Sequence, residues 1–263
     1  MIRVGIGGWT FEPWRNNFYP AGLPQKRELE YASSKLTSIE INGTYYGSQK
    51  PESFRKWAEE TPEDFVFALK GPRFATNRRV LAEAGESVSR FFASGVTELG
   101  RKLGPINWQF MATKKFDADD FAGFLELLPR TVDGVSIRHA VEVRHESFQT
   151  PEFIALARKH HVAVVVADSD THPQIADPTA DFVYARLQNA SEAEKIGYPE
   201  SELSQWRQRA ESWAKGDRPG DLPLIAEAPA KAGERDVFIY MINGFKPKAP
   251  FAAMALIEKL DGR

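Results

Sequence analysis

The pattern of apolar and polar residues along the chain predicts eight β-strands. Eight short runs are rich in Val, Ile, Phe and Tyr and are bounded by Gly, Pro, Asp or Asn, as is typical of buried strands. Longer and more polar segments separate these runs, so the connections have room for helices or loops. The predicted strands cover residues 2–9, 37–46, 64–71, 105–112, 139–145, 162–169, 182–188 and 236–244.

Helical periodicity fills most of the gaps between the strands. The segment 117–128 begins with an acidic N-cap signal and carries Phe121, Phe124 and Leu128 on one face. Between residues 170 and 181 the chain has two prolines and no helical period, so we expect a loop there in place of a helix. Residues 217–235 are rich in Pro, Ala and Gly and are expected to form an irregular insertion. The predicted helices cover residues 24–36, 51–60, 86–103, 117–128, 150–161, 201–216 and 249–260.

Strands that alternate with helices predict a parallel sheet. Eight such units in 263 residues predict a closed (β/α)₈ TIM barrel in one domain, residues 1–263, in which a loop replaces the helix after strand six. A doubly wound open sheet is the alternative, but its G-x-G-x-x-G fingerprint is missing. The stretch "GIGGWT" supplies Gly5 and Gly7 and has Thr10 where the third glycine would stand.

Composition narrows the class of protein. The chain is 42% hydrophobic and 27% charged, an ordinary globular composition, and its net charge of −2 argues against a protein-wide nucleic-acid surface. It has no cysteine, which excludes disulfides, thiolate nucleophiles and Cys-ligated metals. No apolar run approaches about 18 residues, so no membrane segment is expected. The chain opens directly into a strand without a signal-peptide pattern, which favours a cytoplasmic location.

Polar residues near the carboxyl ends of the strands indicate a site. Alternate side chains of a strand share a face, so Ile39 and Ile41 against the helices would turn Glu40 inward. In strand six, Asp168 is expected to share the inner face with Val164. The carboxyl ends of barrel strands form one rim, where active sites lie. The polar residues expected at this rim are Glu40, Asn42, Thr44, Lys70, Gln109, Glu142, Arg144, Asp168, Arg186 and Asn243, the last in phase with Met241.

This ring holds three carboxylates and three cations, and two interpretations of it stay open. In one, the cations Lys70, Arg144 and Arg186 bind an anionic substrate, and Glu142, Asp168 or Glu40 transfers a proton with His145 as partner. In the other, buried salt bridges only hold the barrel together. Ionised carboxylates flanked by cations suit a base better than an acid.

Aromatic and basic residues of the loops add a second signal. Trp9 and Tyr46 lie at the ends of the first two predicted strands, and Trp14 lies in the loop after the first. Such rings stack on sugars or bases, or plug the barrel mouth. Loops three and four carry an excess of basic residues, which favours an anionic ligand or forms a solvated charged surface. These basic residues are Arg73, Arg78, Arg79, Lys114 and Lys115.

Sequence motifs of familiar enzymes are absent. The chain has no G-x-x-x-x-G-K-[ST], no H-E-x-x-H and no G-x-S-x-G. A Ser-His-Asp arrangement of Ser169, His145 and Asp168 has no motif to support it. His145 is the only histidine well placed at the rim, and the cations compete for the carboxylates. We therefore expect no metal and no cofactor.

Several stretches together resemble the domain-of-unknown-function-72 family, also called YecE-like. They are "GIGGWTFEPWRNNFYP", "IEINGTYYGSQKPESFRKW", "GPINWQF", "VEVRHESF" and "VVADS" with "DFVYARLQ", and they extend over nearly the whole chain. The resemblance implies a (β/α)₈ barrel without an established activity. It implies that the motif positions are Trp9, Trp14, Glu40, Asn42, Thr44, Lys70, Gln109, Glu142, Arg144, His145, Asp168, Ser169 and Arg186.

The chain departs from the family pattern at three places. An acidic group usual at the end of the last strand is replaced by Gly244, and the usual His-Gly after strand seven is Gln188 and Asn189. After strand four, residues 111–115 read "MATKK" in place of Leu-Pro-Pro. Roles that depend on these places do not transfer to this chain.

These observations favour an enzyme that performs general acid–base chemistry, hydrolysis or isomerisation, on a small anionic substrate that is phosphorylated or sugar-like. A nucleic-acid-processing or nucleic-acid-binding barrel and a non-catalytic ligand-binding barrel remain as alternatives. The sequence leaves the substrate and the oligomeric state open.

Overall fold

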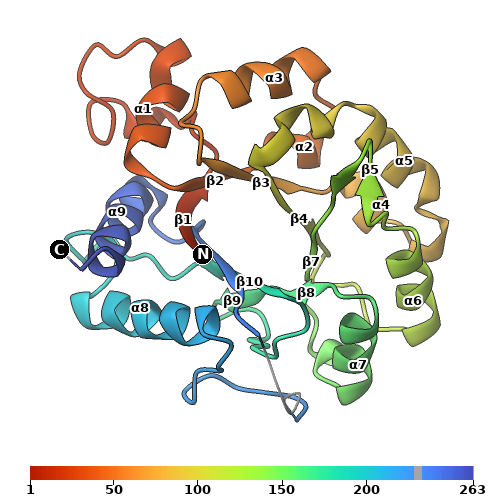
Figure 1. Ribbon diagram of the computed structural model, residues 1–263. Coiled ribbons are helices and arrows are strands. Elements are labelled where there is room, and N and C mark those ends of the chain that lie inside the picture. Colours follow the sequence, from red (N-terminus) through yellow and green to blue (C-terminus); the bar gives the residue numbers. More distant parts are fainter. Residues whose placement is uncertain (228–232, 263) are drawn as a thin grey trace.

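A computed structural model of the protein, which describes residues 1–227 and 233–262, shows one large parallel sheet surrounded by helices. In Figure 1 the strands form a central ring and the main helices lie outside it. The strand order around the sheet is β8-β7-β4-β3-β2-β1-β11-β10-β9. The strands are β1 (Ile2–Gly7), β2 (Ser38–Ile41), β3 (Val66–Lys70), β4 (Leu103–Gln109), β7 (His139–Glu142), β8 (Ala163–Val164), β9 (Val166–Asp168), β10 (Phe182–Leu187) and β11 (Asp236–Met241).

The sheet closes into a barrel through its sixth predicted strand. Only Val165 separates β8 from β9, so the two ends of the strand order are two halves of one strand. β8 pairs with β7, and β9 pairs with β10. All pairings around this sheet are parallel, which confirms the predicted TIM barrel.

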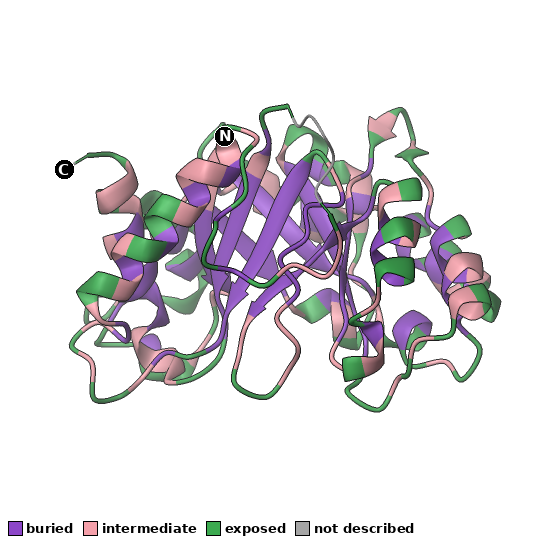
Figure 2. Ribbon diagram, turned by 90° about the horizontal axis from the view of Figure 1, so that it is seen from below, coloured by how far each residue is buried: buried purple, intermediate pink, exposed green. Residues whose placement is uncertain are grey.

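The helices cover the outside of the barrel. Figure 2 shows the strands buried, while the helices are exposed on their outer sides. None of the helices in the described part of the chain is long and apolar enough to cross a bilayer. The helices are α1 (Glu28–Lys35), α2 (Gly43–Tyr46), α3 (Pro51–Glu59), α4 (Arg73–Thr76), α5 (Gly85–Ala93), α6 (Ala118–Glu126), α7 (Pro151–Lys159), α8 (Glu200–Ala214) and α9 (Ala249–Leu260).

The structure differs from the predicted elements in several connections. The helix expected at 86–103 ends at Ala93, because Gly95 takes a φ of 91° that no helical residue adopts, and a 3₁₀ segment follows at Val96–Lys102. Residues 169–181 contain no helix or strand. A small antiparallel hairpin of β5 (Thr131–Val132) and β6 (Val135–Ser136) was not expected. Within the predicted insertion 217–235, residues 217–227 and 233–235 carry no helix or strand, and residues 228–232 lie outside the described residues.

Two apolar clusters lie on the two sides of the sheet. The larger one packs strand residues such as Val164 and Met241 against the helices. The smaller one fills the barrel with side chains that come mostly from strands, including Ala68, Ala163 and Tyr240. Apolar groups fill the interior at this level, and the inward residues Glu40, Glu142 and Arg186 lie toward the carboxyl ends of their strands.

Candidate active site at the barrel mouth

A cavity of about 630 Å³ opens at the carboxyl ends of the strands. Seven of the eight strand positions contribute to it, through strand ends or the residues that directly follow them. Among the described residues its lining includes no aspartate or glutamate, although four cationic side chains reach it. The polar and aromatic lining residues are Trp9, Thr10, Asn42, Tyr46, Gln49, Trp57, Lys70, Gln109, Arg144, Arg186, Asn243 and Lys246.

The floor of the cavity is Arg186 on β10, which is 2% exposed. Its Nε and Nη2 donate to the two carboxylate oxygens of Glu40 at 3.1 and 3.0 Å, and its Nη1 donates to Glu142 Oε2 at 2.5 Å. Tyr184, two residues earlier on the same face of β10, donates its hydroxyl to Glu40 Oε2 at 2.5 Å. A buried guanidinium is thus held in one orientation by two carboxylates from two other strands of the barrel.

Glu142 on β7 is fully buried, and both of its oxygens accept several hydrogen bonds. Oε1 accepts from Arg144 Nε at 2.9 Å and Nη2 at 2.6 Å. Oε2 accepts from Gln109 at 2.9 Å and from Asn107 at 3.2 Å, besides Arg186. Burial by itself raises the pKa of Glu142, but the charges of Arg186, Arg144 and Lys70 outweigh burial and hold that pKa well below its usual range. Glu142 is therefore an ionised anchor for its donors.

Lys70, the last residue of β3, faces the cavity and is 6% exposed. Its Nζ donates to Gln109 Oε1 at 2.7 Å and lies 4.5 Å from the ring centroid of Tyr45 on α2. Burial and then the charge of Arg186 lower the pKa of Lys70 to about 8, although Glu40 and Glu142 oppose the shift. Lys70 is thus a cavity group that changes its protonation close to neutral pH.

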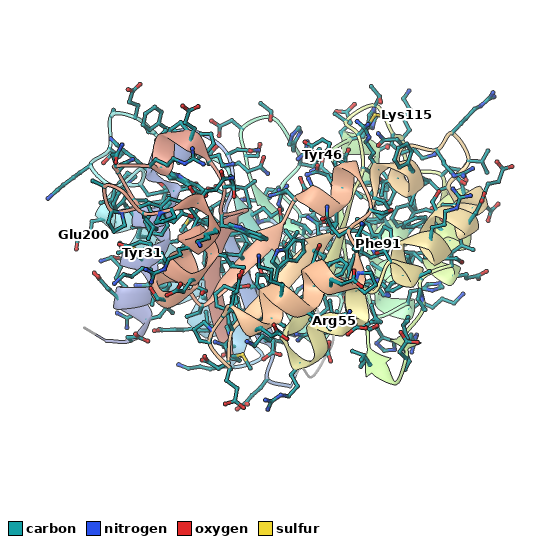
Figure 3. All side chains as sticks on the ribbon, turned by 90° about the horizontal axis from the view of Figure 1, so that it is seen from above. Tyr31, Tyr46, Arg55, Phe91, Lys115 and Glu200 are labelled. Carbon is teal, nitrogen blue, oxygen red and sulfur yellow. The ribbon has the colours of Figure 1, made fainter. Side chains whose placement is uncertain are left out.

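The side walls of the cavity are aromatic and amide groups. Trp9 packs edge-on against Trp57 on α3, with ring centroids 5.3 Å apart. Tyr46 at the end of α2 is 63% exposed, and Figure 3 shows it at the same edge of the molecule as Lys115. Asn42 follows β2, and its amide nitrogen lies 3.5 Å from the backbone oxygen of Glu40. The walls therefore offer apolar ring faces beside a cationic floor.

The inner faces predicted for strands six and eight are wrong. Val164 and Val166 pack in the cluster that contains the helices, whereas Ala163 and Val165 face the barrel interior. Asp168 therefore points toward the helical layer. Asn243 reaches the cavity, but only because it lies beyond the end of β11, where it donates to Gln188 Oε1 at 3.0 Å. In β11 itself, Met241 faces the helices and Tyr240 faces the interior.

Asp168 lies in a separate acidic environment. Its Oδ1 accepts from Asn189 Nδ2 at 3.4 Å, and its Oδ2 is buried without a hydrogen-bond partner among the described residues. Burial, and next the negative charges of Glu202 and Asp170, raise the pKa of Asp168 to about 6, against the opposing effects of Arg209 and Asn189. The structure does not bring this carboxylate together with the cationic floor.

His145 and Trp14 also lie outside the cavity lining. His145 Nδ1 accepts from the backbone N–H of Ser147 at 3.1 Å, so this ring caps the short turn Glu146–Phe148. Trp14 has no exposed surface and donates its indole N–H to the backbone oxygen of Lys246 at 3.0 Å. In this structure Trp14 is buried within the loop that follows β1 and has no exposed surface with which to contact a ligand. The predicted catalytic role of His145 stays a prediction.

Several residues of the site were missed from the sequence. Asn107 precedes Gln109 by two positions on β4, so the two-residue alternation of a strand could have placed it on the inner face. Tyr184 was expected on the inner face with Arg186 but was not assigned to the site. Lys246 lies in a 3₁₀ turn, Lys246–Lys248, whose sequence gives no such period. In the described residues no group of three or more His, Asp or Glu side chains is placed to hold a metal ion.

Two of the three departures from the family pattern lie side by side next to Asn243, which lines the cavity. Gly244 has a φ of 70°, and a Cβ there would lie 2.3 Å from the backbone oxygen of Ala190. Gln188 is buried beside it and accepts from Asn243. A side chain at 244 would therefore disturb the chain that follows β10.

The fold and the site define a (β/α)₈ barrel protein with a cationic cavity at the carboxyl ends of its strands. A family model described as "Protein of unknown function DUF72" matches residues 3–263. The chain belongs to the DUF72 family, as the resemblance of its motifs predicted.

Relatives of known sequence agree with this assignment. UPF0759 protein YecE of Escherichia coli K12 is 28% identical over 151 residues, which cover 56% of this chain and 50% of YecE. UPF0759 protein YunF of Bacillus subtilis strain 168 is 31% identical over 70 residues, 27% of this chain and 24% of YunF. The matched part therefore spans half the length of YecE and about a quarter of the length of YunF.

Two solved DUF72 structures have the same fold over nearly their whole length. The protein from Thermotoga maritima superposes with a TM-score of 0.75 at 23% identity and covers 99% of both chains. The protein from Enterococcus faecalis V583 gives a TM-score of 0.74 at 17% identity over 99% of this chain and 96% of its own. At such identities the likeness shows the fold alone.

Proposed function

We propose that this protein is an enzyme that performs acid–base chemistry on a small anionic substrate bound at the barrel mouth. One observation carries the proposal. Lys70, Arg144, Arg186 and Lys246 reach a cavity whose described lining has no carboxylate. The two acids that pair with the arginines of this cluster, Glu40 and Glu142, have no exposed surface. The cavity therefore presents positive charge to a ligand, which favours an anion.

The size of the cavity and the chemistry of its walls narrow the class of substrate further. A cavity of about 630 Å³ falls within the range of small-molecule sites. The rings of Trp9 and Trp57 provide apolar faces of the kind that stack on a sugar, while Asn42 and Gln109 offer amide groups for hydroxyls. A phosphorylated or otherwise anionic sugar-sized molecule suits both features.

In this proposal Lys70 takes the role of proton carrier. The sequence suggested Glu142, Glu40, Asp168 and His145 for that role, but the first two have their oxygens occupied by donors and the last two lie outside the cavity lining. A lysine whose pKa is about 8 accepts and donates protons at neutral pH. Glu40 and Glu142 then act as positioning residues for the two arginines.

Phosphate titration calorimetry tests the anion site. We expect wild-type protein to bind inorganic phosphate and Arg144→Met to bind it about tenfold more weakly, because a charge-assisted hydrogen bond is lost. Arg101→Met, at a side chain that is 82% exposed and far from the cavity lining, is the control and should bind as wild type. Equal affinity of Arg144→Met and wild type would contradict the proposal.

Catalysis is tested separately from binding. A screen of phosphorylated sugars and sugar acids should find turnover that Lys70→Met and Lys70→Arg abolish while phosphate binding by Lys70→Arg persists. Binding without turnover of any compound would favour a non-catalytic ligand-binding barrel. The cytoplasmic location and the single domain over residues 1–263 stay predictions.

One observation favours a nucleic-acid-binding barrel as a second candidate. At the rim, Arg73 lies 5.8 Å from the ring centroid of Tyr46 and 5.5 Å from that of Phe74, and both rings are more than half exposed. Such stacks bind single-stranded nucleic acid. Fluorescence anisotropy with an oligonucleotide at low salt should then show binding that falls steeply as salt is added, and no affinity at low salt removes this candidate.

A further inference from the structure

The amine of Lys70 is placed as a nucleophile at the bottom of the cavity. It extends from the end of β3 into the same cavity that Arg144 and Arg186 reach. Its one hydrogen-bond partner in the described structure is the neutral amide oxygen of Gln109, at 2.7 Å. The ring of Tyr45 lies on another side, with its centroid 4.5 Å from Nζ. The amine is thus oriented by a neutral acceptor and an aromatic ring.

The charged groups around Lys70 leave its positive charge without a direct counter-ion. In the described residues no carboxylate oxygen lies within 4.0 Å of Lys70 Nζ, because Glu40 pairs with Arg186 and Glu142 pairs with both arginines. Burial and then the like charge of Arg186 lower the pKa of Lys70, Glu40 and Glu142 oppose this shift, and Arg144 adds a smaller like-charge effect. These conditions favour the neutral, nucleophilic amine, as in other lysines activated by desolvation and neighbouring cations.

We propose that Lys70 forms a Schiff base with the carbonyl carbon of a small anionic aldehyde, ketone or oxo acid. The inference rests on the proposed anion site, because Arg144 and Arg186 would hold the anionic group while the carbonyl carbon meets the amine. It names a substrate class and a covalent step that acid–base chemistry alone does not require.

The covalent step balances without an added oxidant or reductant. Neutral Lys70 Nζ attacks the carbonyl carbon, and the π electrons of the C=O bond move to oxygen. One proton leaves nitrogen and one reaches oxygen through water in the open cavity, which gives a carbinolamine. Protonation of its hydroxyl by solvent and loss of water then leave a protonated imine. One amine, one carbonyl and one proton have become one iminium ion and one water.

Lys246 offers an internal comparison. It also lines the cavity, but it lies in a turn after β11 and its Nζ sits over the rings of Phe11 and Trp14 at 4.4 and 5.2 Å. Burial lowers the pKa of Lys246 as well, while the two aromatic faces favour its charged ammonium. Lys70 has, in addition to burial, the like charge of Arg186 beside it, so we expect Lys246 to react with a carbonyl less readily than Lys70.

Reductive trapping tests the inference on the intact wild-type protein. Protein is incubated at pH 7 with pyruvate or glycolaldehyde phosphate and sodium cyanoborohydride, and modified lysines are located by peptide mass spectrometry. We expect Lys70 to be labelled at least about tenfold more than exposed lysines, and more than Lys246, because about a tenth of its amine is neutral at this pH, against less than about a thousandth for an ordinary lysine. Lys70→Arg should lose this label and no other.

The outcomes separate the two proposals. Protection of Lys70 by inorganic phosphate, and reduced labelling in Arg144→Met, would support both. Phosphate binding with Lys70 labelled no more than exposed lysines would overturn the Schiff base and leave the anion site standing. Labelling of Lys70 by neutral glycolaldehyde, with no phosphate binding and no preference for anionic carbonyls, would overturn the anion site and the anionic substrate class. Because the trapping uses wild-type protein, a variant that fails to fold does not obscure the result.

Discussion

Arg186 and Glu40 form a two-pronged ion pair across the inside of the barrel, with N···O distances of 3.0 and 3.1 Å. Arg186 is 2% exposed and Glu40 is not exposed at all. Neither group can replace its partner with bulk water. The pair therefore belongs to the class of buried ion pairs in which the loss of one member leaves an uncompensated charge.

Removing the charge of Glu40 should destabilise the protein strongly. Glu40→Gln leaves Arg186 short of one counter-charge, and we expect the free energy of unfolding to fall by about 3 kcal/mol. Urea denaturation followed by circular dichroism measures this change. Glu63→Gln removes the partner of Arg101 in a pair whose side chains are both 82% exposed, and it should have no measurable effect. Equal effects of the two substitutions would show that Glu40 contributes no more than a surface charge.

Sulfate affinity should decrease as the pH rises through about 8. The pKa of Lys70 is lowered to about 8 by burial and by Arg186, so the cavity loses one positive charge near that pH. Groups that face Lys70 from other elements are Arg186 and Glu40 on other strands of the barrel, Glu142 with Arg144, and the ring of Tyr45. Sulfate keeps its charge in this range, so calorimetric titration from pH 6.5 to 9.5 reports the protein alone.

The Lys70→Arg variant provides the control for this pH profile. Arginine stays protonated in this range, so its sulfate affinity should not change between pH 7 and 9. A wild-type affinity that is equally flat would mean that Lys70 keeps its proton or does not contact the anion.

Asp168→Asn should stabilise the protein at pH 7 and leave it unchanged near pH 3.5. The folded-state pKa of Asp168 is raised to about 6, chiefly by burial, so its stabilising effect is fully present below the unfolded pKa and is lost as the pH rises through 6. At pH 7 the native carboxylate is charged at a cost, and the amide removes roughly 1–2 kcal/mol of it after allowance for partial exposure. Urea denaturation at both pH values measures the difference. Asp181→Asn, at an exposed position, is the control; a stabilisation that does not depend on pH would contradict this cause.

Restoring a side chain at position 244 should cost stability. Gly244→Ala places a Cβ 2.3 Å from the oxygen of Ala190 at a φ of 70°, so we expect a loss of about 2–3 kcal/mol, measured by urea denaturation. Gly134→Ala is a matched control, since Gly134 has a similar φ of 78° and a Cβ at that position would have no neighbouring atom within 4 Å. That control should lose only about 1 kcal/mol from the backbone conformation. Equal losses would show that the chain near Ala190 moves aside freely.

The strand periods predicted most of the fold and much of the candidate site. Glu40 was expected inside because Ile39 and Ile41 beside it need the helical layer. Arg186 was expected inside because it shares a face with Tyr184, and both Glu40 and Arg186 lie inside. Lys70 was expected inside because it shares a face with Ala68, and it lines the cavity. In these strands the alternation showed which face points inward, because a polar residue distinguishes one face from the other.

Strand six shows why the same reasoning fails elsewhere. In strand six, Ala163 and Val165 face inward while Val164 and Val166 face outward. Both faces are apolar, so the sequence pattern does not show which face points into the barrel. Asp168, the first polar residue, was then assigned to the wrong side. Lys246 was missed because a turn after the last strand places it, and the position of a turn in space depends on packing that periodicity does not describe.

The interruption of strand six at Val165 leaves β7–β8 as the shortest strand pairing in the barrel. β7 joins β8 only at Ala140–Ala163 and Val141–Val164, whereas β10 and β11 stay in register from Phe182 to Leu187. Local opening of a sheet starts where the fewest backbone hydrogen bonds resist it. The barrel should therefore open first between β7 and β8, and amide hydrogens there should exchange with solvent before those between β10 and β11.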